Sequence, residues 1–364
     1  MKSMDTKAKI GLRVQKMHGE QFRQILLRSD LMDHQYQIRP DGDSIIIPLI
    51  PDVALGIIRS ALEDNEIPFT LETYQFEVSK KRPVKDYREF LSDIPGDLYC
   101  FLPTSFDVIG SICLVKLHAD IENYGVSIAR AIMATHSSIS GIFQDRGVTG
   151  EFRVRDLRHL AGAISTTTIH REYGLHLKVD VTEAYFSPRL AAERARIVST
   201  ILSEGESPPG PFLDMFAGVG PYAIAIARQH PNSIVHAIDI NPRAIELMQQ
   251  NIMLNKTENI SSYCGDSREI VQELAQTMRF HTIIMNLPHD AIDFLSDALV
   301  AIDHGMIHLY SICPPEELSD REETIRSIIN RSHTCNSIES SELKGYSPAE
   351  SVYSHDLRVS PKLE

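Results

Sequence analysis

The chain of 364 residues lacks several features that mark whole classes of protein. No apolar run approaches the ~20 residues that a membrane-spanning helix needs. The opening stretch, MKSMDTKAKIGLRVQK, has no long apolar region after its charges, so we expect no signal peptide. The five cysteines are scattered and never form a CxxC pair, which argues against a disulfide framework or a zinc site. We therefore expect a cytoplasmic protein that holds no metal.

Positive charge is also scarce, and the deficit is unevenly spread. The chain carries 36 basic and 49 acidic side chains, a net charge of −13. Residues 191–364 alone carry 13 basic and 24 acidic side chains. Nonspecific nucleic-acid binding depends on positive charge, so this composition argues weakly against it. A local basic surface in the earlier part of the chain stays compatible with these counts.

The sequence contains no internal repeat and no low-complexity tract, and its length suits two or three domains of roughly 100–200 residues. Residues 1–70 predict a small N-terminal α/β domain. Its strands are expected at 10–14 and 44–49, and its helices at 20–28 and 52–62. The polar stretch 79–89, which contains a proline, is typical of a linker.

Residues 71–180 predict a middle α+β domain. A strand is expected at 112–117 and a helix at 124–133. In the stretch STTTIHREYGLHLKVDV (165–181), two alternating runs flank Glu172-Tyr173-Gly174, which is the pattern of a β-hairpin.

From residue 181 to residue 364, expected strands alternate with expected helices. The strands are predicted at 212–215, 234–238, 283–285 and 306–310. Asn241 is expected to cap a helix that begins at Pro242. The stretches 337–346 and 351–359 are expected to form a closing antiparallel pair. Alternating strands and helices form a parallel, doubly wound sheet, so we expect a Rossmann-like α/β domain here.

The stretch DMFAGVGPYAIAIA (214–227) places a glycine turn between an expected strand and an expected helix. Glycine lets the backbone approach a ligand closely at the carboxyl end of a strand. Taken alone, such a turn is equally consistent with a tight strand–helix connection. The pattern D-x-F-x-G-x-G, with Asp214, Phe216 and Gly218, differs from the dinucleotide pattern GxGxxG. It resembles the S-adenosylmethionine (SAM) loop of Rossmann-like methyltransferases.

Two aspartates follow later strands of the same region. Asp239 stands 19 residues after Gly220, where a carboxylate can accept hydrogen bonds from both ribose hydroxyls of a nucleoside. Asp266, in CGDSRE (264–269), ends a further element, and SAM enzymes commonly have an acidic residue there that faces the adenine amino group. Asp239 is also consistent with a helix-capping or solvated aspartate, and Asp266 is also consistent with a turn aspartate. The spacing favours the cofactor interpretation for Asp239 and leaves the two interpretations of Asp266 equal.

The stretch IIMNLPHD ends a buried strand on Asn286-Leu287-Pro288. Strands often stop at turn residues, and alone that interpretation is the better one. Methyltransferases that modify amino groups or ring nitrogens of bases often carry a similar Asp/Asn-Pro-Pro-aromatic motif after the fourth strand. An amide can both donate to and accept from a base edge, and proline fixes the backbone that aims it. With three SAM-site elements upstream, the functional interpretation becomes the stronger one.

Two further stretches gather arginines. In AYFSPRLAAERARIV (184–198), Arg189 and Glu193 are spaced i, i+4, which alone favours an ordinary surface ion pair worth ~0.3–0.5 kcal/mol. GEFRVRDLRHLAG (150–162) contains Arg153, Arg155 and Arg158. This second stretch is consistent with a solvated basic face and with a face that contacts phosphates.

Together these residues make the sequence resemble the archaeal and eukaryotic class of tRNA (guanine-37-N1)-methyltransferases. The blocks that carry the resemblance occur in the family's order, and they are GEFRVRDLRHLAG, TTTIHREYG, YFSPRLAAERARI, DMFAGVGPYAI, AIDINPRAIELM and IMNLP. MHGEQFRQILL near the N-terminus and the later SFDVIG are also similar. The resemblance covers nearly the whole chain and is much more specific than a SAM loop alone.

The resemblance implies a role for each matching residue. Glu193 would be the general base that removes the N1 proton of guanine, and Arg153 would stabilise negative charge on guanine O6. Asn286 and Pro288 would shape the base pocket, and Tyr185 and Arg189 would position the target nucleotide. The residues implied in SAM binding are Arg194, Asp239, Ile240, Asp266, Ser267 and Asn286, beside Asp214, Phe216 and Gly218 of the loop.

The resemblance also implies a reaction and partners. A sulfonium is already an activated methyl donor, so the transfer needs no catalytic metal. The target base would leave the anticodon-loop stack at a cost of a few kcal/mol. The N-terminal domain would recognise tRNA shape away from the anticodon, the middle domain would bind RNA, and the SAM domain would span 181–364. We expect a monomer, because tRNA already supplies a large contact surface.

Three alternatives stay open. Wybutosine-pathway relatives transfer the aminocarboxypropyl group of SAM instead of methyl, but they generally lack Asn-Leu-Pro together with the arginine–glutamate block. Some relatives also methylate a tricyclic guanosine derivative at the same position. The chain could also be a tRNA-binding protein with a vestigial SAM site, although binding alone would not require Glu193, Arg153 and Asn286 together.

Overall fold

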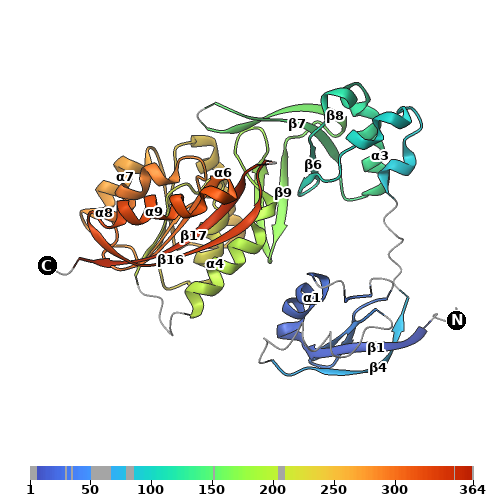
Figure 1. The fold of residues 1–364 in the computed structure, drawn as a ribbon, viewed down its shortest axis with the longest axis horizontal. Coiled ribbons are helices and arrows are strands. Elements are labelled where there is room, and N and C mark those ends of the chain that lie inside the picture. Colours follow the sequence, from blue (N-terminus) through green and yellow to red (C-terminus); the bar gives the residue numbers. More distant parts are fainter. Residues whose placement is uncertain are drawn as a thin grey trace. The chain divides into compact units, whose positions relative to one another are not determined.

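The computed structural model divides the chain into two compact units, Met1–Lys85 and Asp86–Glu364 (Figure 1). The residues that it describes are 6–28, 31–33, 36–50, 67–78, 86–150, 152–203, 210–347 and 349–362. The helix predicted at 52–62 and residues 79–85 of the predicted linker lie outside this set. No helix among the described residues is long and apolar enough to cross a membrane.

The first unit is built on an antiparallel sheet with the strand order β2-β3-β1-β4. Its elements are β1 (Thr6–Gln15), α1 (Gly19–Arg28), β2 (Arg39–Asp41), β3 (Ser44–Pro48) and β4 (Thr70–Glu77). Leu12 and Val14 of β1 pack with Phe22 and Leu26 of α1 in a small apolar core. The strands predicted at 10–14 and 44–49 and the helix predicted at 20–28 are confirmed.

The second unit begins with a mixed sheet of order β5-β6-β7-β8. The elements are β5 (Asp107–Ile109), β6 (Ile112–Val115), α3 (Gly125–Thr135), β7 (Gly141–Thr149) and β8 (Val154–Gly162). The predicted hairpin is confirmed as β9 (Thr167–Glu172) and β10 (Leu175–Asp180). Its two turn residues, Tyr173 and Gly174, have φ of 44° and 80°, as a tight two-residue hairpin loop requires.

The remainder of the second unit is a seven-stranded sheet of order β13-β12-β11-β14-β15-β17-β16. The strands are β11 (Phe212–Asp214), β12 (Val235–Asp239), β13 (Ile260–Cys264), β14 (Thr282–Met285), β15 (Gly305–Cys313), β16 (His333–Gly345) and β17 (Ser351–Pro361). The first five in the spatial order pair in parallel, and β17 is antiparallel to both of its neighbours. The predicted doubly wound fold and its closing antiparallel pair are therefore confirmed.

Helices cover both faces of this sheet (Figure 1). They are α4 (Ala191–Ser203), α5 (Pro221–Gln229), α6 (Pro242–Asn255), α7 (Ser267–Ala275), α8 (Leu295–Val300) and α9 (Leu318–Ile329). Alternate strand residues serve the two faces: Leu213 and Ile283 pack with residues of α7 to α9, whereas Phe212 and Ile284 pack with residues of α4 to α6. Burial on both faces explains why these strands are continuous apolar runs.

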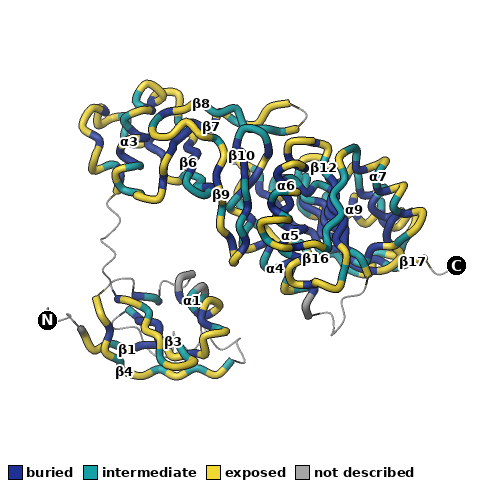
Figure 2. The backbone as a smooth tube through the Cα atoms, turned by 180° about the vertical axis from the view of Figure 1, so that it is seen from behind, coloured by how far each residue is buried: buried dark blue, intermediate teal, exposed yellow. Residues whose placement is uncertain are grey.

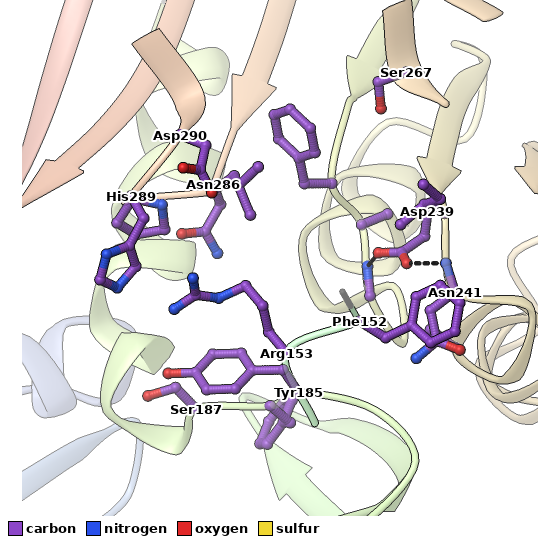
Figure 3. Close-up of a pocket in the computed structure, with 18 of the residues that line it drawn as sticks. Phe152, Arg153, Tyr185, Ser187, Asp239, Asn241, Ser267, Asn286, His289 and Asp290 are labelled. Carbon is purple, nitrogen blue, oxygen red and sulfur yellow. Dashed lines mark hydrogen bonds between the residues drawn. The ribbon is translucent and has the colours of Figure 1, made fainter. Parts of the chain in front are cut away.

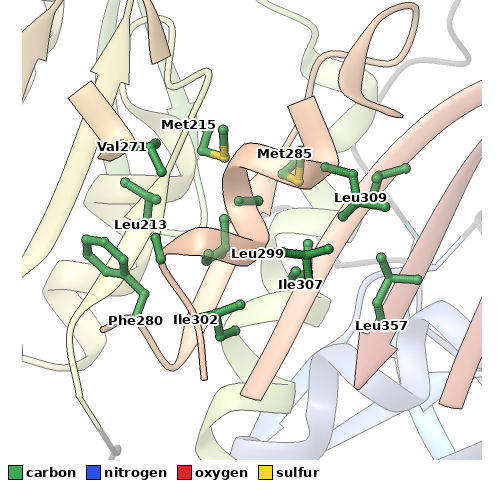
Figure 4. Packing of buried hydrophobic residues seen from close by; sticks show 14 of the residues in the cluster. Leu213, Met215, Val271, Phe280, Met285, Leu299, Ile302, Ile307, Leu309 and Leu357 are labelled. Atoms are coloured by element: carbon green, nitrogen blue, oxygen red, sulfur yellow. The ribbon is translucent and has the colours of Figure 1, made fainter. Parts of the chain in front are cut away.

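The core on the α7–α9 side is a contiguous apolar cluster (Figure 4). It joins Met215 and Met285, at the ends of neighbouring strands, to Ile307 and Leu309 of β15. The burial map shows the same arrangement, with buried strands beneath helices that are exposed on their outer sides (Figure 2). β11 lies between β12 and β14 in the sheet, so the loops that follow β12 and β14 lead away from one another. Doubly wound sheets bind ligands at the point where such loops diverge.

Candidate active site

A cavity of about 690 Å³ lies at the carboxyl ends of β11, β12, β13 and β14. This volume falls within the ~300–1,000 Å³ range of small-molecule and cofactor sites. The loops after these strands form one side of the cavity. The turn between β7 and β8, the segment before α4 and part of β16 form the other side. Residues from both predicted domains of the second unit therefore share one site.

The glycine turn after β11 forms the floor of the cavity. Gly218 and Gly220 have φ of 56° and 84°, in the left-handed region that favours glycine. A Cβ at Gly220 would lie 2.6 Å from Met248 Cγ, whereas a Cβ at Gly218 would meet nothing closer than 3.6 Å. Phe216 and Gly218 line the cavity. Asp214 does not line it: the carboxyl is buried behind the turn, and burial raises its pKa to about 7.

Asp239 ties the turn to the next loop. One carboxylate oxygen accepts from the Gly218 N–H at 2.6 Å, and the other accepts from the Asn241 N–H at 2.8 Å (Figure 3). Asn241 in turn caps α6 by accepting from the Arg243 N–H at 3.0 Å, which confirms the predicted cap. Asp239 lines the cavity, and burial raises its pKa. Two of its roughly four acceptor positions remain for a ligand.

Ile240, Asp266 and Ser267 border the same part of the cavity. Asp266 caps α7 by accepting from the Arg268 N–H at 2.8 Å, a local backbone contact that sequence reasoning had not predicted for it. The Ser267 hydroxyl donates to the Met215 carbonyl at 2.5 Å and holds this loop against the end of β11. Ile240 is 43% exposed and supplies an apolar wall.

Asn286 and Arg153 approach the cavity from opposite sides. Their side chains and that of His289 point toward one another (Figure 3). Among the described residues, nothing hydrogen-bonds to the Asn286 amide and nothing forms an ion pair with the Arg153 guanidinium. Burial is the main cause of the lowered pKa of His289, and the nearby Arg153 charge adds to it. Two unpaired polar groups that converge in a cavity are free to bind a ligand.

Local backbone structure fixes both groups. Arg153 lies in the turn between β7 and β8, with φ of 50° and its N–H donating to the Gly150 carbonyl at 3.1 Å. After Asn286, the Leu287 carbonyl accepts from the N–H groups of Asp290 and Ala291 at 3.0 and 2.8 Å, which forms a tight turn. The Pro288 carbonyl accepts from the Ile312 N–H at 3.1 Å and ties this turn to β15. Pro288 lines the cavity beside Asn286.

Arg155 corrects the interpretation of the arginine-rich stretch 150–162. Its side chain is only 8% exposed and pairs with Asp145 and, at 3.7 Å, with Asp107. It therefore joins three segments inside the unit and is neither solvated nor available to a phosphate. Its guanidinium lies 5.2 Å from the ring centroid of Tyr185, which lines the cavity and is 43% exposed.

The ion pair suggested by the spacing of Arg189 and Glu193 is wrong. Arg189 lies in a short 3-10 turn (Pro188–Leu190) that precedes α4, so the two side chains do not have α-helical spacing. Arg189 Nε pairs with Asp107 Oδ1 at 2.6 Å, outside the cavity lining. Arg189 is therefore anchored to the first residue of β5.

Glu193, in the first turn of α4, is 6% exposed and does not line the cavity. Its carboxylate accepts from Arg196 Nε and Nη2, both at 2.7 Å, and from the Tyr310 hydroxyl at 2.9 Å. Arg194 does line the cavity, but its guanidinium is held by both oxygens of Glu172, at 2.7 and 2.5 Å. The predicted base thus lies behind the wall, and the neighbouring arginine already has an anionic partner.

Sequence reasoning missed three groups at the site. Glu172 holds Arg194, and Tyr222 lines the cavity from α5. Lys344 reaches it from β16, where Nζ donates to Ser187 Oγ at 3.3 Å and burial lowers the pKa of the amine. Lys344 lies on a strand outside the recognised motifs, and Glu172 was treated only as part of the hairpin, so no local signal marked either one. Tyr222 stood inside the glycine-turn motif and was treated only as part of a helix.

Comparison with family models matches three segments of the chain. The TRM5/TYW2 methyltransferase domain matches residues 168–337. The TYW2 N-terminal domain matches residues 87–166, and the tRNA methyltransferase 5 N-terminal domain matches residues 11–54. The first two matches together cover most of the unit that contains the cavity.

Individual relatives match over greater lengths. The tRNA (guanine(37)-N(1))-methyltransferase Trm5b of Pyrococcus abyssi is 37% identical over 88% of this chain and 90% of its own. Trm5b of Methanocaldococcus jannaschii is 34% identical over 96% of this chain and 99% of its own. The tRNA(Phe) (4-demethylwyosine(37)-C(7)) aminocarboxypropyltransferase of Pyrococcus horikoshii is 30% identical over 75% of this chain and 95% of its own.

Solved structures agree with these matches. The crystal structure of Pyrococcus abyssi Trm5b has a TM-score of 0.67 and 34% identity, over 97% of this chain and 99% of that one. The protein in the complex of aTrm5 with tRNALeu has a TM-score of 0.64 and 33% identity, over 96% of this chain and 99% of that one.

Proposed function

The chain belongs to the family of tRNA (guanine(37)-N(1))-methyltransferases, and we propose that it transfers the methyl group of SAM to N1 of guanosine 37 in the tRNA anticodon loop. One observation carries the proposal beyond family membership. The guanidinium of Arg153 and the amide of Asn286, neither of which has a partner among the residues that the structure describes, converge on one cavity at the carboxyl edge of the sheet. This pair suits the O6 and N1 edge of a guanine, which presents an acceptor beside a donor.

The residues of the cavity fit SAM. The open space above Gly218 lets a ligand lie against the backbone, and Asp239 retains acceptor positions for ribose hydroxyls. Ile240, Asp266 and Ser267 would enclose the adenine, with Phe216 at the same wall. Asp214 and Arg194 would support the site through the glycine turn and through Glu172, because neither presents a free charged group to the cavity.

Guanine N1 carries a proton at neutral pH, so methyl transfer needs a base. Bound SAM supplies a methyl group that its sulfonium already activates. Glu193 accepts the N1 proton as the N1 electron pair forms the bond to the methyl carbon and the carbon–sulfur bond breaks. Arg153 stabilises the negative charge that develops on guanine O6. S-adenosylhomocysteine and 1-methylguanosine are the products.

Glu193 lies outside the cavity lining, so the wall beside it must rearrange before its carboxylate reaches a bound guanine. Catalytic hydrogen bonds often tighten only in the substrate complex. Tyr185, Arg189 and Pro288 would hold the target nucleotide once it has left the anticodon-loop stack. Residues 1–70 would recognise tRNA shape, residues 71–180 would contact RNA, and residues 181–364 would bind SAM, in a chain that acts as a monomer.

The test is incubation with methyl-labelled SAM and unmodified tRNA transcripts that carry guanosine or adenosine at position 37. We expect label as 1-methylguanosine from the guanosine transcript and none from the adenosine transcript. Label on another nucleoside would contradict the proposed target while leaving SAM as the cofactor. The Glu193→Ala variant, assayed alongside, should lose most of the activity if Glu193 is the base.

A second candidate is aminocarboxypropyl transfer, which the match of residues 87–166 and the Pyrococcus horikoshii relative favour. In that reaction the other carbon–sulfur bond breaks, and methylthioadenosine is released. Carboxyl-labelled SAM separates the two reactions, because its label enters tRNA only in aminocarboxypropyl transfer. The presence of Asn286 and Pro288 together with Arg153 and Glu193 favours methyl transfer.

A further inference from the structure

A row of buried hydrogen bonds connects the cavity wall with Glu193. The Tyr222 hydroxyl donates to the Tyr310 hydroxyl at 3.0 Å, and Tyr310 donates to Glu193 Oε1 at 2.9 Å. Tyr222 lines the cavity, and both tyrosines are at most 2% exposed. Each hydroxyl donates a hydrogen bond to the next oxygen in the row, and the last acceptor is the Glu193 carboxylate. Neither tyrosine was part of any role suggested by the sequence.

The surroundings of the two phenols are apolar. Tyr222 and Tyr310 lie in the same cluster as Phe212, Ile226 and Ile284. A buried hydroxyl without a partner is costly in such a setting, so each phenol depends on the next member of the row. Burial raises the pKa of both Tyr222 and Tyr310 above the ordinary value of a phenol, so both remain neutral donors.

The opposite side of Glu193 is held by Arg196. Its Nε and Nη2 donate to the two oxygens of Glu193, and its Nη1 and Nη2 donate to Asp356 at 2.6 and 3.1 Å. Asp356 is also joined to His308 Nδ1 at 2.7 Å. Arg196 is therefore fixed between two carboxylates and cannot turn freely away from Glu193.

These contacts leave a specific vacancy on the carboxylate. An ionised carboxylate offers about four lone-pair positions. Tyr310 and Arg196 Nη2 occupy both positions of Oε1, and Arg196 Nε occupies one position of Oε2. One lone pair of Oε2 is left among the contacts of the described residues. This lone pair of Oε2 is therefore the position on Glu193 that an incoming proton can occupy.

We propose that Tyr310, held in place by Tyr222, is a positioning residue that orients the Glu193 carboxylate and leaves one lone pair of Oε2 open to the incoming proton. This inference rests on the proposed function, in which Glu193 is the general base. Tyr310 does not touch the cavity, so its action is indirect.

Other charged and titratable groups surround the row of Tyr222, Tyr310 and Glu193. They are Arg194 and Arg196 on α4, His308 on β15, Asp356 on β17 and Asp214 on β11. A Tyr310→Phe change removes one donor and leaves these charges in place. The charged carboxylate then loses a stabilising contact, so the acid limb of the pH–rate profile moves to higher pH.

The experiment measures the single-turnover rate of methyl transfer to the guanosine-37 transcript across pH for wild type, Tyr310→Phe and Tyr222→Phe. For Tyr310→Phe we expect a roughly tenfold lower rate at neutral pH, an acid limb at higher pH and unchanged KM for SAM and tRNA. Tyr222→Phe should shift the limb in the same direction by less. The control is Tyr87→Phe, which removes another buried phenol hydrogen bond, to the Pro103 carbonyl at 2.7 Å, and should leave the limb unmoved.

An acid limb that stays at the wild-type pH in Tyr310→Phe overturns the proposal, whatever the change in rate. If Tyr310→Phe does not fold, Tyr222→Phe decides the question, and an unmoved limb there overturns the proposal too. Failure of the proposed function gives a different result, because wild type would then form no 1-methylguanosine. An active wild type with an inactive Glu193→Gln and unshifted tyrosine variants would refute only the role of the tyrosines.

Discussion

The two sides of the cavity are built in different ways. On the side of the strand ends, the Asp239 carboxylate is held by two backbone N–H groups from loops that directly follow β11 and β12. Behind the wall of the opposite side, the Glu193 carboxylate is held by side chains of Arg196 and Tyr310, which are 3 and 117 positions away along the chain. Backbone donors survive almost any substitution, whereas side-chain donors do not. We therefore expect the first side to tolerate change in its neighbours and the second to be sensitive to single substitutions.

The comparison predicts different kinetic consequences for the two sides. Residues of the strand-end side should govern SAM affinity, and residues of the opposite side should govern the rate of transfer. A variant on one side that changes the property assigned to the other would break the comparison.

The largest effect is expected for Glu193→Gln, which keeps the size of the side chain and removes the base. The single-turnover rate should fall by about 10²–10⁴-fold, because general-base catalysis typically contributes that much. SAM affinity, measured by calorimetry, should stay within about twofold of wild type. A rate loss below tenfold would show that another group removes the proton.

Arg153→Ala should lower the single-turnover rate by about 10²-fold, as removal of one donor to a developing oxyanion commonly does. The matched control is Arg158→Ala, since Arg158 follows on β8 but is exposed. The control should keep nearly the full rate at saturating tRNA. Equal losses in both variants would mean that Arg153 acts through general attraction of RNA.

Asp239→Ala should weaken SAM binding by about 10–100-fold, because it removes the acceptors proposed for the ribose and leaves two backbone N–H groups without their partner. Calorimetric titration with SAM measures the change. Asp303→Ala alters an exposed carboxylate that pairs with Arg279 and should bind SAM normally. Unchanged affinity in Asp239→Ala would place the ribose elsewhere.

The smallest effect is expected on stability, from Asp214→Asn. Burial raises the pKa of Asp214 to about 7, above the ordinary value of 3.8, so the folded state holds this proton more tightly than the unfolded state. Wild type should therefore lose stability as pH rises from about 4 to about 7, and the asparagine variant should lose less. We expect a difference of a few degrees in Tm at pH 8, measured by thermal unfolding. An identical pH dependence in both proteins would exclude titration of Asp214 in this range.

The strand-end side could be predicted from sequence because its parts are local. Each of its predicted features depends on residues that are close neighbours along the chain. These features are the alternation of strands and helices, the glycine turn and the cap at Asn241. Parallel strands then bring their carboxyl ends to one edge, so Asp239, Asp266 and Asn286 follow from topology alone. The hairpin around Tyr173 and Gly174 is local in the same sense.

Other features depended on contacts that no short stretch contains. β8 was not predicted, because its exposed polar residues and its ion-paired Arg155 disrupt the apolar alternation of a strand. The partner of Arg189 proved to be Asp107, 82 positions away, because the 3-10 turn before α4 rotates the side chain out of helical register. Spacing arguments fail where the local helix type changes.

The sequence by itself determined the doubly wound sheet and the residues at its carboxyl edge, because apolar periodicity and turn chemistry act over a few neighbouring residues. Only the tertiary structure decided which charged side chains at the site form ion pairs within the protein. Arg153 and Arg194 are both arginines of recognised blocks, yet Glu172 holds Arg194 while Arg153 has no ion-pair partner among the described residues. It also decided that Glu193 lies behind the wall, joined to Tyr310 and Arg196. A buried charge must find its partner wherever packing places one, and that choice is made across the whole fold.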